Sequence, residues 1–120
     1  MKGNFFFNVL PVSCNIGGQE VEVRQQERLE KNLLGQSYVT GSYIAIANTV
    51  NFDDKPTPTS KTNTFFHELT HAILDTMGYY DLSGDEKFVC AFAGFMTEAM
   101  RSAEYNEEEF SVVLDKTEKR

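Results

Sequence analysis

Several kinds of residue are scarce in this sequence, and each scarcity excludes a class of protein. The 120 residues include only two cysteines, Cys14 and Cys90, and no CxxC pair. This usage excludes a disulfide-rich secreted scaffold and is typical of reduced thiols in the cytoplasm. No segment reaches the roughly 20 apolar residues that a membrane span requires, so we expect no membrane partner and a cytoplasmic location.

Basic residues are also scarce, because 11 Lys and Arg stand against 18 Asp and Glu for a net charge of −7. Nucleic-acid binding depends on clustered Lys and Arg, so we expect no nucleic-acid partner. Apolar residues are plentiful, at 41% of the chain, which is enough for a core in a domain of this length. We therefore predict one domain over residues 1–120, with a frayed tail at about 116–120.

The first half of the sequence reads as strands. We predict strands over 5–12 and 20–24, joined through a turn at Gly17-Gly18, because the second segment alternates polar and apolar residues. A helical turn or two is predicted within 25–32, and a third strand over 42–48. With two helices downstream, these segments predict an α+β fold, a small antiparallel or mixed sheet packed on two core helices.

The only two histidines form one motif, His67-Glu68-Leu69-Thr70-His71, which is an HExxH sequence. Positions four apart share a helix face, so both imidazoles can bind one metal ion, with Zn–N distances of about 2.0–2.1 Å. Glu68 projects from nearly the same face and can act as a general base toward a water molecule. The motif predicts a catalytic Zn²⁺ site.

The HExxH motif lies within a predicted helix over residues 61–77. Thr59 or Ser60 is a suitable N-cap, and Gly78 is a suitable left-handed C-terminal residue. Apolar residues at helical spacing predict that this helix is buried in the core, and they are Leu69, Ile73 and Met77.

A catalytic zinc site needs a third protein ligand, and the sequence has no third histidine. We predict Glu86 at the start of a second helix, which begins after Gly84 and runs through Met100, apolar on most sides and central in the fold. Small residues on one stripe of this helix would allow it to pack closely on the first, and they are Cys90, Ala93, Gly94 and Thr97. Asp85 is the second choice, with a shorter side chain.

Two other interpretations of these residues stay open. Ser83-Gly84-Asp85-Glu86 also matches a capping box, in which the Glu86 side chain would bond back to the helix start. A structural zinc site built from both cysteines and both histidines is a further alternative, although the cysteines lack the close spacing typical of such sites.

Supporting residues are harder to assign from sequence. Asp75, four residues after His71, is a candidate to accept the N–H of that imidazole, although it could equally be an exposed residue of the last turn. Four tyrosines are candidates to stabilise an oxyanion, and they are Tyr43, Tyr79, Tyr80 and Tyr105.

The stretches 64–74 and 85–93 resemble minimal phage and prophage zincins related to the ImmA/IrrE-type metallopeptidases. The resemblance is specific over about residues 60–96. It implies that His67, His71 and Glu86 bind zinc and that Glu68 activates water. The interval from His71 to Glu86 is short for this family, and Cys90 stands where thermolysin-like relatives place an aspartate.

We therefore expect a zinc metallopeptidase that hydrolyses a protein or peptide substrate in a phage or prophage setting. Zinc is expected in a cleft between the helices and the edge of the strand at 43–48, where an extended peptide could pair. The alternative is a catalytically silent, zinc-stabilised binding protein of a phage or mobile element.

Overall fold

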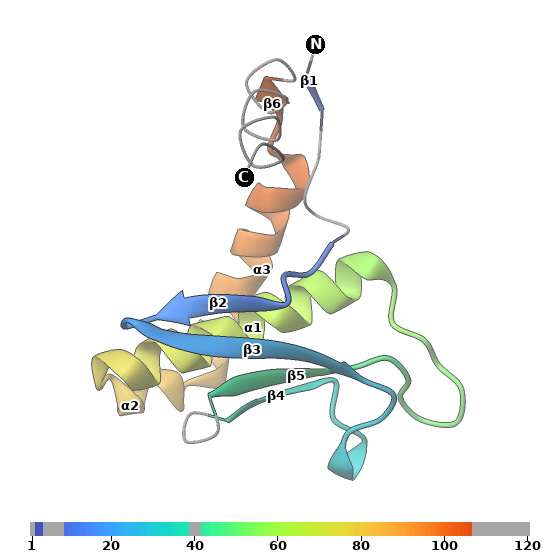
Figure 1. Ribbon diagram of the computed structural model, residues 1–120, viewed down its shortest axis with the longest axis horizontal. Coiled ribbons are helices and arrows are strands. Elements are labelled where there is room, and N and C mark those ends of the chain that lie inside the picture. The colour runs from blue at the N-terminus through green and yellow to red at the C-terminus, as the bar shows by residue number, and fades with distance from the viewer. Residues whose placement is uncertain (1, 4–8, 39–41, 107–120) are drawn as a thin grey trace, which may run out of the picture.

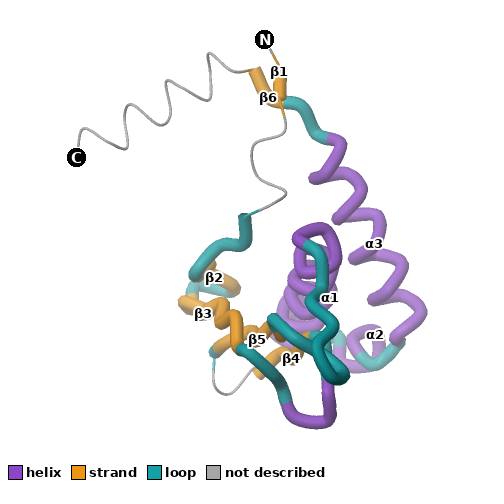
Figure 2. Tube along the Cα trace, turned by 90° about the vertical axis from the view of Figure 1, so that its right-hand side faces the viewer, coloured by secondary structure: helices purple, strands orange, loops and turns teal. Residues whose placement is uncertain are grey.

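The computed structural model describes residues 2–3, 9–38 and 42–106. Its main sheet, the long helix α1 and the helix α3 form successive layers, with α1 between the other two (Figures 1 and 2). This mixed sheet packed on helices is an α+β arrangement, as the sequence predicts. None of the helices in these ranges is both long and apolar enough to cross a bilayer.

Among the described residues, the main sheet has four strands in the order β2-β3-β5-β4. Their bounds are β2 Ser13–Ile16, β3 Gln19–Gln26, β4 Gly35–Tyr38 and β5 Tyr43–Ala47. β3 and β5 run parallel, whereas the other two pairs are antiparallel. A separate antiparallel pair joins β1 (Lys2–Gly3) to β6 (Tyr105–Asn106), and a short 3-10 helix, η1, spans Glu30–Asn32.

The turn at Gly17-Gly18 is confirmed, and it joins β2 to β3. Both glycines have positive φ, at 61° and 82°, the conformation that two-residue hairpins favour. The strand predicted over 5–12 is wrong where it can be compared: residues 4–8 lie outside the described ranges, and 9–12 precede β2 without being a strand. Pro11 has no N–H to donate to a strand ladder, and β2 begins only at Ser13.

The second correction concerns the segment between β3 and β5. The helical prediction over 25–32 is wrong except for η1, because β3 continues to Gln26. β4 was not predicted from the sequence, and it pairs with β5 on the side opposite β3. β5 is therefore an inner strand, and the prediction of a free edge at residues 43–48 is wrong.

Helix α1 spans Pro58–Met77 and therefore begins three residues before the predicted start. Thr57 is the N-cap, its hydroxyl oxygen accepts a hydrogen bond from Ser60 N at 3.1 Å, and Pro58 fills the first helical position, which suits its fixed φ. Gly78 ends the helix with φ of 85°, as predicted. The predicted N-caps, Thr59 and Ser60, are therefore wrong, because both lie inside the helix.

One face of α1 closes the core against the sheet. The cluster of buried apolar residues consists of Val21, Val23, Ile44, Ile46, Phe65 and Ala72. Leu69 packs against it, but Ile73 and Met77 are exposed. The predicted apolar stripe is therefore wrong in its last two positions.

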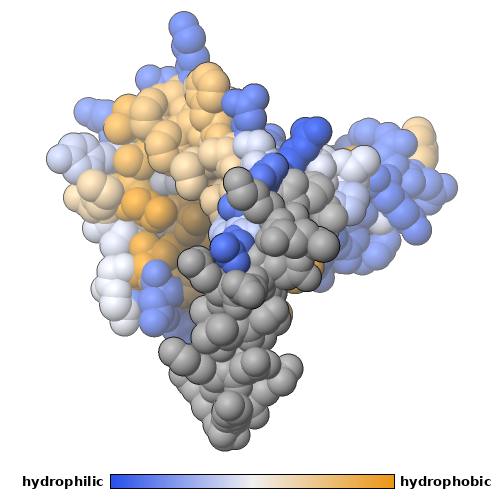
Figure 3. Space-filling view, turned by 90° about the horizontal axis from the view of Figure 1, so that it is seen from above, coloured by the Kyte–Doolittle hydropathy of each residue, from blue (hydrophilic) through white to orange (hydrophobic). Residues whose placement is uncertain are grey.

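Helix α3 spans Glu86–Ser102 and runs antiparallel to α1, after the four-residue helix α2 (Tyr80–Ser83) that the sequence analysis missed. Val89, Ala93 and Thr97 are buried on the side toward α1. Phe92 and Phe95 are 45% and 72% exposed, so the prediction that α3 is central in the fold is wrong. Apolar residues gather at the surface on one side of the molecule (Figure 3).

Candidate metal centre

The two histidines of the motif lie one turn apart on the face of α1 that meets α3. Their ring centroids are 4.9 Å apart and the ring planes are inclined by 70°. Both side chains are partly buried, at 22% and 18% exposed. The α-helical spacing of the motif thus brings both imidazoles to one place, as expected.

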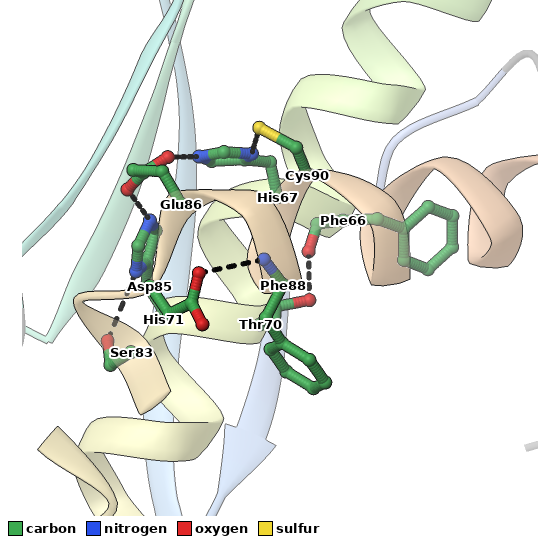
Figure 4. Close-up of polar contacts among 9 residues, drawn as sticks. All are labelled: Phe66, His67, Thr70, His71, Ser83, Asp85, Glu86, Phe88 and Cys90. Carbon is green, nitrogen blue, oxygen red and sulfur yellow. Dashed lines mark hydrogen bonds and ion pairs between the residues drawn. The ribbon is translucent and has the colours of Figure 1, made fainter. Parts of the chain in front are cut away.

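Glu86 contacts both imidazoles with its carboxylate (Figure 4). Its Oε2 lies 3.3 Å from His67 Nε2, and its Oε1 lies 3.1 Å from His71 Nε2. Ligand atoms of the three side chains all lie within 4.8 Å of one another, and they form a group that could hold a metal ion.

The start of α3 explains how Glu86 reaches this position. Asp85 is the N-cap, and its Oδ1 accepts a hydrogen bond from Phe88 N at 3.2 Å. Glu86 is therefore the first helical residue, so the capping-box interpretation, which needs Ser83 as the N-cap, is wrong. Asp85 is engaged as the cap, whereas Glu86 is directed at the imidazoles (Figure 4).

The types of donor atom and the two contacts of Glu86 are compatible with a zinc ion. Two imidazole nitrogens and one carboxylate are a common set in catalytic zinc sites. Two ligands at the corners of a tetrahedron with bonds of 2.0–2.2 Å lie about 3.4 Å apart, which is close to the separations of 3.3 and 3.1 Å found here. The Glu86 side chain is 62% exposed, so the group is open to solvent on that side.

The outer nitrogen of each imidazole has its own neighbour. His71 Nδ1 lies 3.1 Å from Ser83 Oγ, and His67 Nδ1 lies 3.9 Å from Cys90 Sγ. With Nδ1 next to Ser83 and Nε2 next to Glu86, the His71 ring has no nitrogen left for Asp75, so that prediction is wrong. Ser83 was missed because it belongs to α2, which is too short to give a periodic signal.

The interpretation of a site with two cysteines is also wrong. Cys14 lies in β2 and packs against the core cluster between the sheet and α1. Cys90 faces the Nδ1 side of His67, away from the Nε2 atoms that converge on Glu86 (Figure 4). Both cysteines are free, and burial raises the pKa of the Cys14 thiol.

Glu68 is buried, at 8% exposed, on the side of α1 that faces β4. A Cβ added to Gly35 in β4 would lie 3.1 Å from Glu68 Cγ and 2.5 Å from Thr64 Cγ2. A glycine is therefore required for this close approach. Gly35, like Ser83, was not predicted from the sequence as part of this centre.

Burial also changes the acidity of this centre. Burial, and to a smaller extent the negative charge of Glu86, raise the pKa of Glu68 to about 7. Burial lowers the pKa of His67, against the opposing effect of Glu86. A carboxyl group with a pKa near 7 can both take up and release a proton at neutral pH, and a neutral imidazole is the form that binds metal.

The tyrosine candidates for oxyanion stabilisation are not all near the centre. Tyr43 stacks on Tyr38 with ring centroids 4.3 Å apart, and the Arg24 guanidinium lies 3.7 Å from the Tyr43 ring. Because the neighbouring Ile44 side chain is in the core, Tyr43 points to the opposite face of the sheet. Tyr105 lies in β6, beyond the far end of α3 (Figure 1). Tyr79, the N-cap of α2, and Tyr80, its first residue, are exposed and stay candidates.

Comparisons with known proteins identify no relative of this chain. The chain matches no protein-family model, no curated protein and no solved structure. The resemblance to zincins therefore depends on the HExxH motif and on the geometry described above.

Proposed function

We propose that this protein is a zinc metallopeptidase that hydrolyses peptide bonds with Glu68 as the general base. The observation that carries the proposal is the convergence of His67, His71 and Glu86 next to a buried Glu68 whose pKa is raised to about 7. Zinc bound by those three side chains would lower the pKa of a water molecule to about 7 and polarise a peptide carbonyl.

Glu68 would move one proton in each reaction cycle. Its carboxylate accepts a proton from the attacking water as the new C–O bond forms. The resulting carboxyl group holds that proton until the C–N bond breaks, and then donates it to the leaving amine. Burial against Gly35 limits the positions that the carboxylate can adopt, which favours one geometry for both transfers.

The strand next to Glu68 supports an extended peptide as the substrate. β4 has one neighbour, β5, within the described sheet, so its other edge is available for a further strand. A peptide paired there would gain main-chain hydrogen bonds. The substrate edge that we first expected at β5 is thus proposed for β4, which contacts α1 along the segment that carries Glu68.

The wider setting is part of the proposal. The resemblance to phage and prophage zincins implies a protein substrate in such a context, and two free cysteines suit a cytoplasmic location. The net charge of −7 argues against nucleic acid as the partner.

One observation favours the alternative, a zinc-stabilised binding protein without activity. Phe92 and Phe95 are exposed on α3, and exposed apolar patches often mark protein interaction sites. The solvent-accessible Glu86 supports the peptidase instead, because a purely structural zinc site is closed by four protein ligands.

The proposal is tested with metal analysis and a library of quenched fluorescent peptides. Protein purified without an affinity tag should contain about one zinc per chain by plasma mass spectrometry, and should cleave peptides in a chelator-sensitive way. Glu68→Gln should retain the zinc and lose cleavage, whereas the exposed control Glu98→Gln should retain both. Cleavage that persists in Glu68→Gln would overturn the proposed base, and zinc without any cleavage would favour the binding protein.

A further inference from the structure

The two imidazoles share an unusual kind of neighbour at Nδ1. In most metal sites this nitrogen donates its proton to a carboxylate, a backbone carbonyl or a water molecule. Here the neighbours are the Ser83 hydroxyl at 3.1 Å from His71 and the Cys90 thiol at 3.9 Å from His67. A hydroxyl both donates and accepts hydrogen bonds, and a thiol does so weakly.

The contact with Ser83 is the stronger of the two. Ser83 is buried, at 6% exposed, whereas Cys90 is exposed. The backbone around Ser83 is held by hydrogen bonds from Ser83 N to Tyr79 O at 3.0 Å and from Gly84 N to Tyr80 O at 2.9 Å. One short segment, from Ser83 to Glu86, therefore contacts both nitrogens of the His71 ring (Figure 4).

The two nitrogens of His71 have different protonation requirements with and without a metal ion. In the metal-free protein, a proton on Nε2 can be donated to Glu86, at 3.1 Å, and Nδ1 can then accept a hydrogen bond from the Ser83 O–H. Metal binding requires an unprotonated Nε2, so the neutral ring then carries its proton on Nδ1 and donates it to Ser83 Oγ. The ring thus loses the proton on Nε2 and gains one on Nδ1. Ser83 keeps its own proton and only rotates its hydroxyl group.

We propose that Ser83 is a positioning residue that holds the His71 ring in one orientation in both the metal-free and the metal-bound protein. A carboxylate at this place could serve only the metal-bound form, because it only accepts. The hydroxyl spares the ring a rotation when the ion enters or leaves. This inference rests on the proposed zinc site, and it concerns how the metal is acquired and retained.

The test is zinc affinity, measured by competition with a chromogenic chelator. Ser83→Ala should bind zinc 10 to 100 times more weakly, the range found when such partners are removed. Ser83→Thr keeps the hydroxyl and should recover most of the affinity. Ser102→Ala removes an exposed hydroxyl at the other end of α3 and should bind like the wild type.

Nitrogen NMR of the imidazoles gives a readout that a loss of folding would not imitate. In the wild type, the protonated nitrogen of His71 should change from Nε2 to Nδ1 when zinc is added. Ser83→Ala should keep its backbone spectrum and give broadened His71 ring signals without the metal.

The outcomes separate this inference from the proposed function. If Ser83→Ala binds zinc as tightly as the wild type while His71→Ala does not bind it, the role of Ser83 is overturned and the zinc site stands. A wild-type protein that binds no zinc would overturn both.

Discussion

Glu68 and Glu86 lie near the same two imidazoles but in opposite surroundings. Glu68 is on α1, buried against β4, and its pKa is raised to about 7. Glu86 begins α3, its side chain is 62% exposed, and its two oxygens face His67 and His71. Burial thus decides which carboxylate is suited to hold a proton, and direction toward the Nε2 atoms decides which is suited to hold a metal.

The largest expected effects come from exchanging each carboxylate for its amide. Glu68→Gln should lower kcat about 100- to 10,000-fold, the usual contribution of a general base, with zinc content unchanged. Glu86→Gln should lower zinc affinity by more than about 100-fold, because it changes a proposed metal ligand itself and not only a residue that contacts a ligand. Peptide cleavage and chelator competition measure the two effects. Equal loss of zinc in both variants would contradict the assignment of separate roles.

The stability of the protein should depend on pH through Glu68. A carboxyl group whose pKa rises from 4.5 to about 7 on folding binds more protons in the folded state across that window. The unfolding free energy therefore falls as the pH rises through it, by roughly 3 kcal/mol for this group. Metal-free Glu68→Gln should be more stable than the wild type at pH 8, and this advantage should disappear at pH 4.

Urea denaturation of both proteins at several pH values measures this difference. The lowered pKa of His67 acts in the opposite direction below pH 6.5, but it is common to both proteins and cancels in the comparison. A constant difference between pH 4 and 8 would show that Glu68 titrates normally.

Substitutions of two glycines by alanine should change stability less, and each serves as the control for the other. Gly35→Ala would place a Cβ 2.5 Å from Thr64 Cγ2 and close to Glu68, so it should destabilise the protein by about 1–3 kcal/mol and disturb cleavage. A Cβ added at Gly94 would have no neighbour within 4 Å among the described residues beyond the nearby backbone of α3 itself, so Gly94→Ala should stabilise the helix by up to about 1 kcal/mol. Thermal unfolding measures both. Equal effects of the two substitutions would contradict the close approach of β4 to α1.

The residues of the site were more predictable from sequence than their surroundings. The i, i+4 spacing of the histidines depends only on helix geometry, and Glu86 follows on the next long helix. β4 was missed because Gly35–Tyr38 has no polar and apolar alternation, and the strand forms through pairing with β5. Ser83 was missed because a four-residue helix has no detectable period.

Burial was the least predictable property. Helix α3 has enough apolar residues for a central position, but only the stripe with Val89 and Ala93 is covered, by α1. Composition does not determine how many neighbours a helix has. The start of α1 was misplaced for a more local reason, because Pro58 can equally precede a helix or begin one.

The connection from His67 to Glu86 has a consequence for folding speed. The three proposed ligands lie within residues 67–86, so their meeting closes only a short loop, with a small loss of chain entropy. The parallel pairing of β3 with β5 closes a loop of similar length, from Val23 to Ile44, and therefore at a similar cost in chain entropy. Zinc bound where α1 meets α3 would hold the two helices together, so it would speed those folding steps that follow this contact.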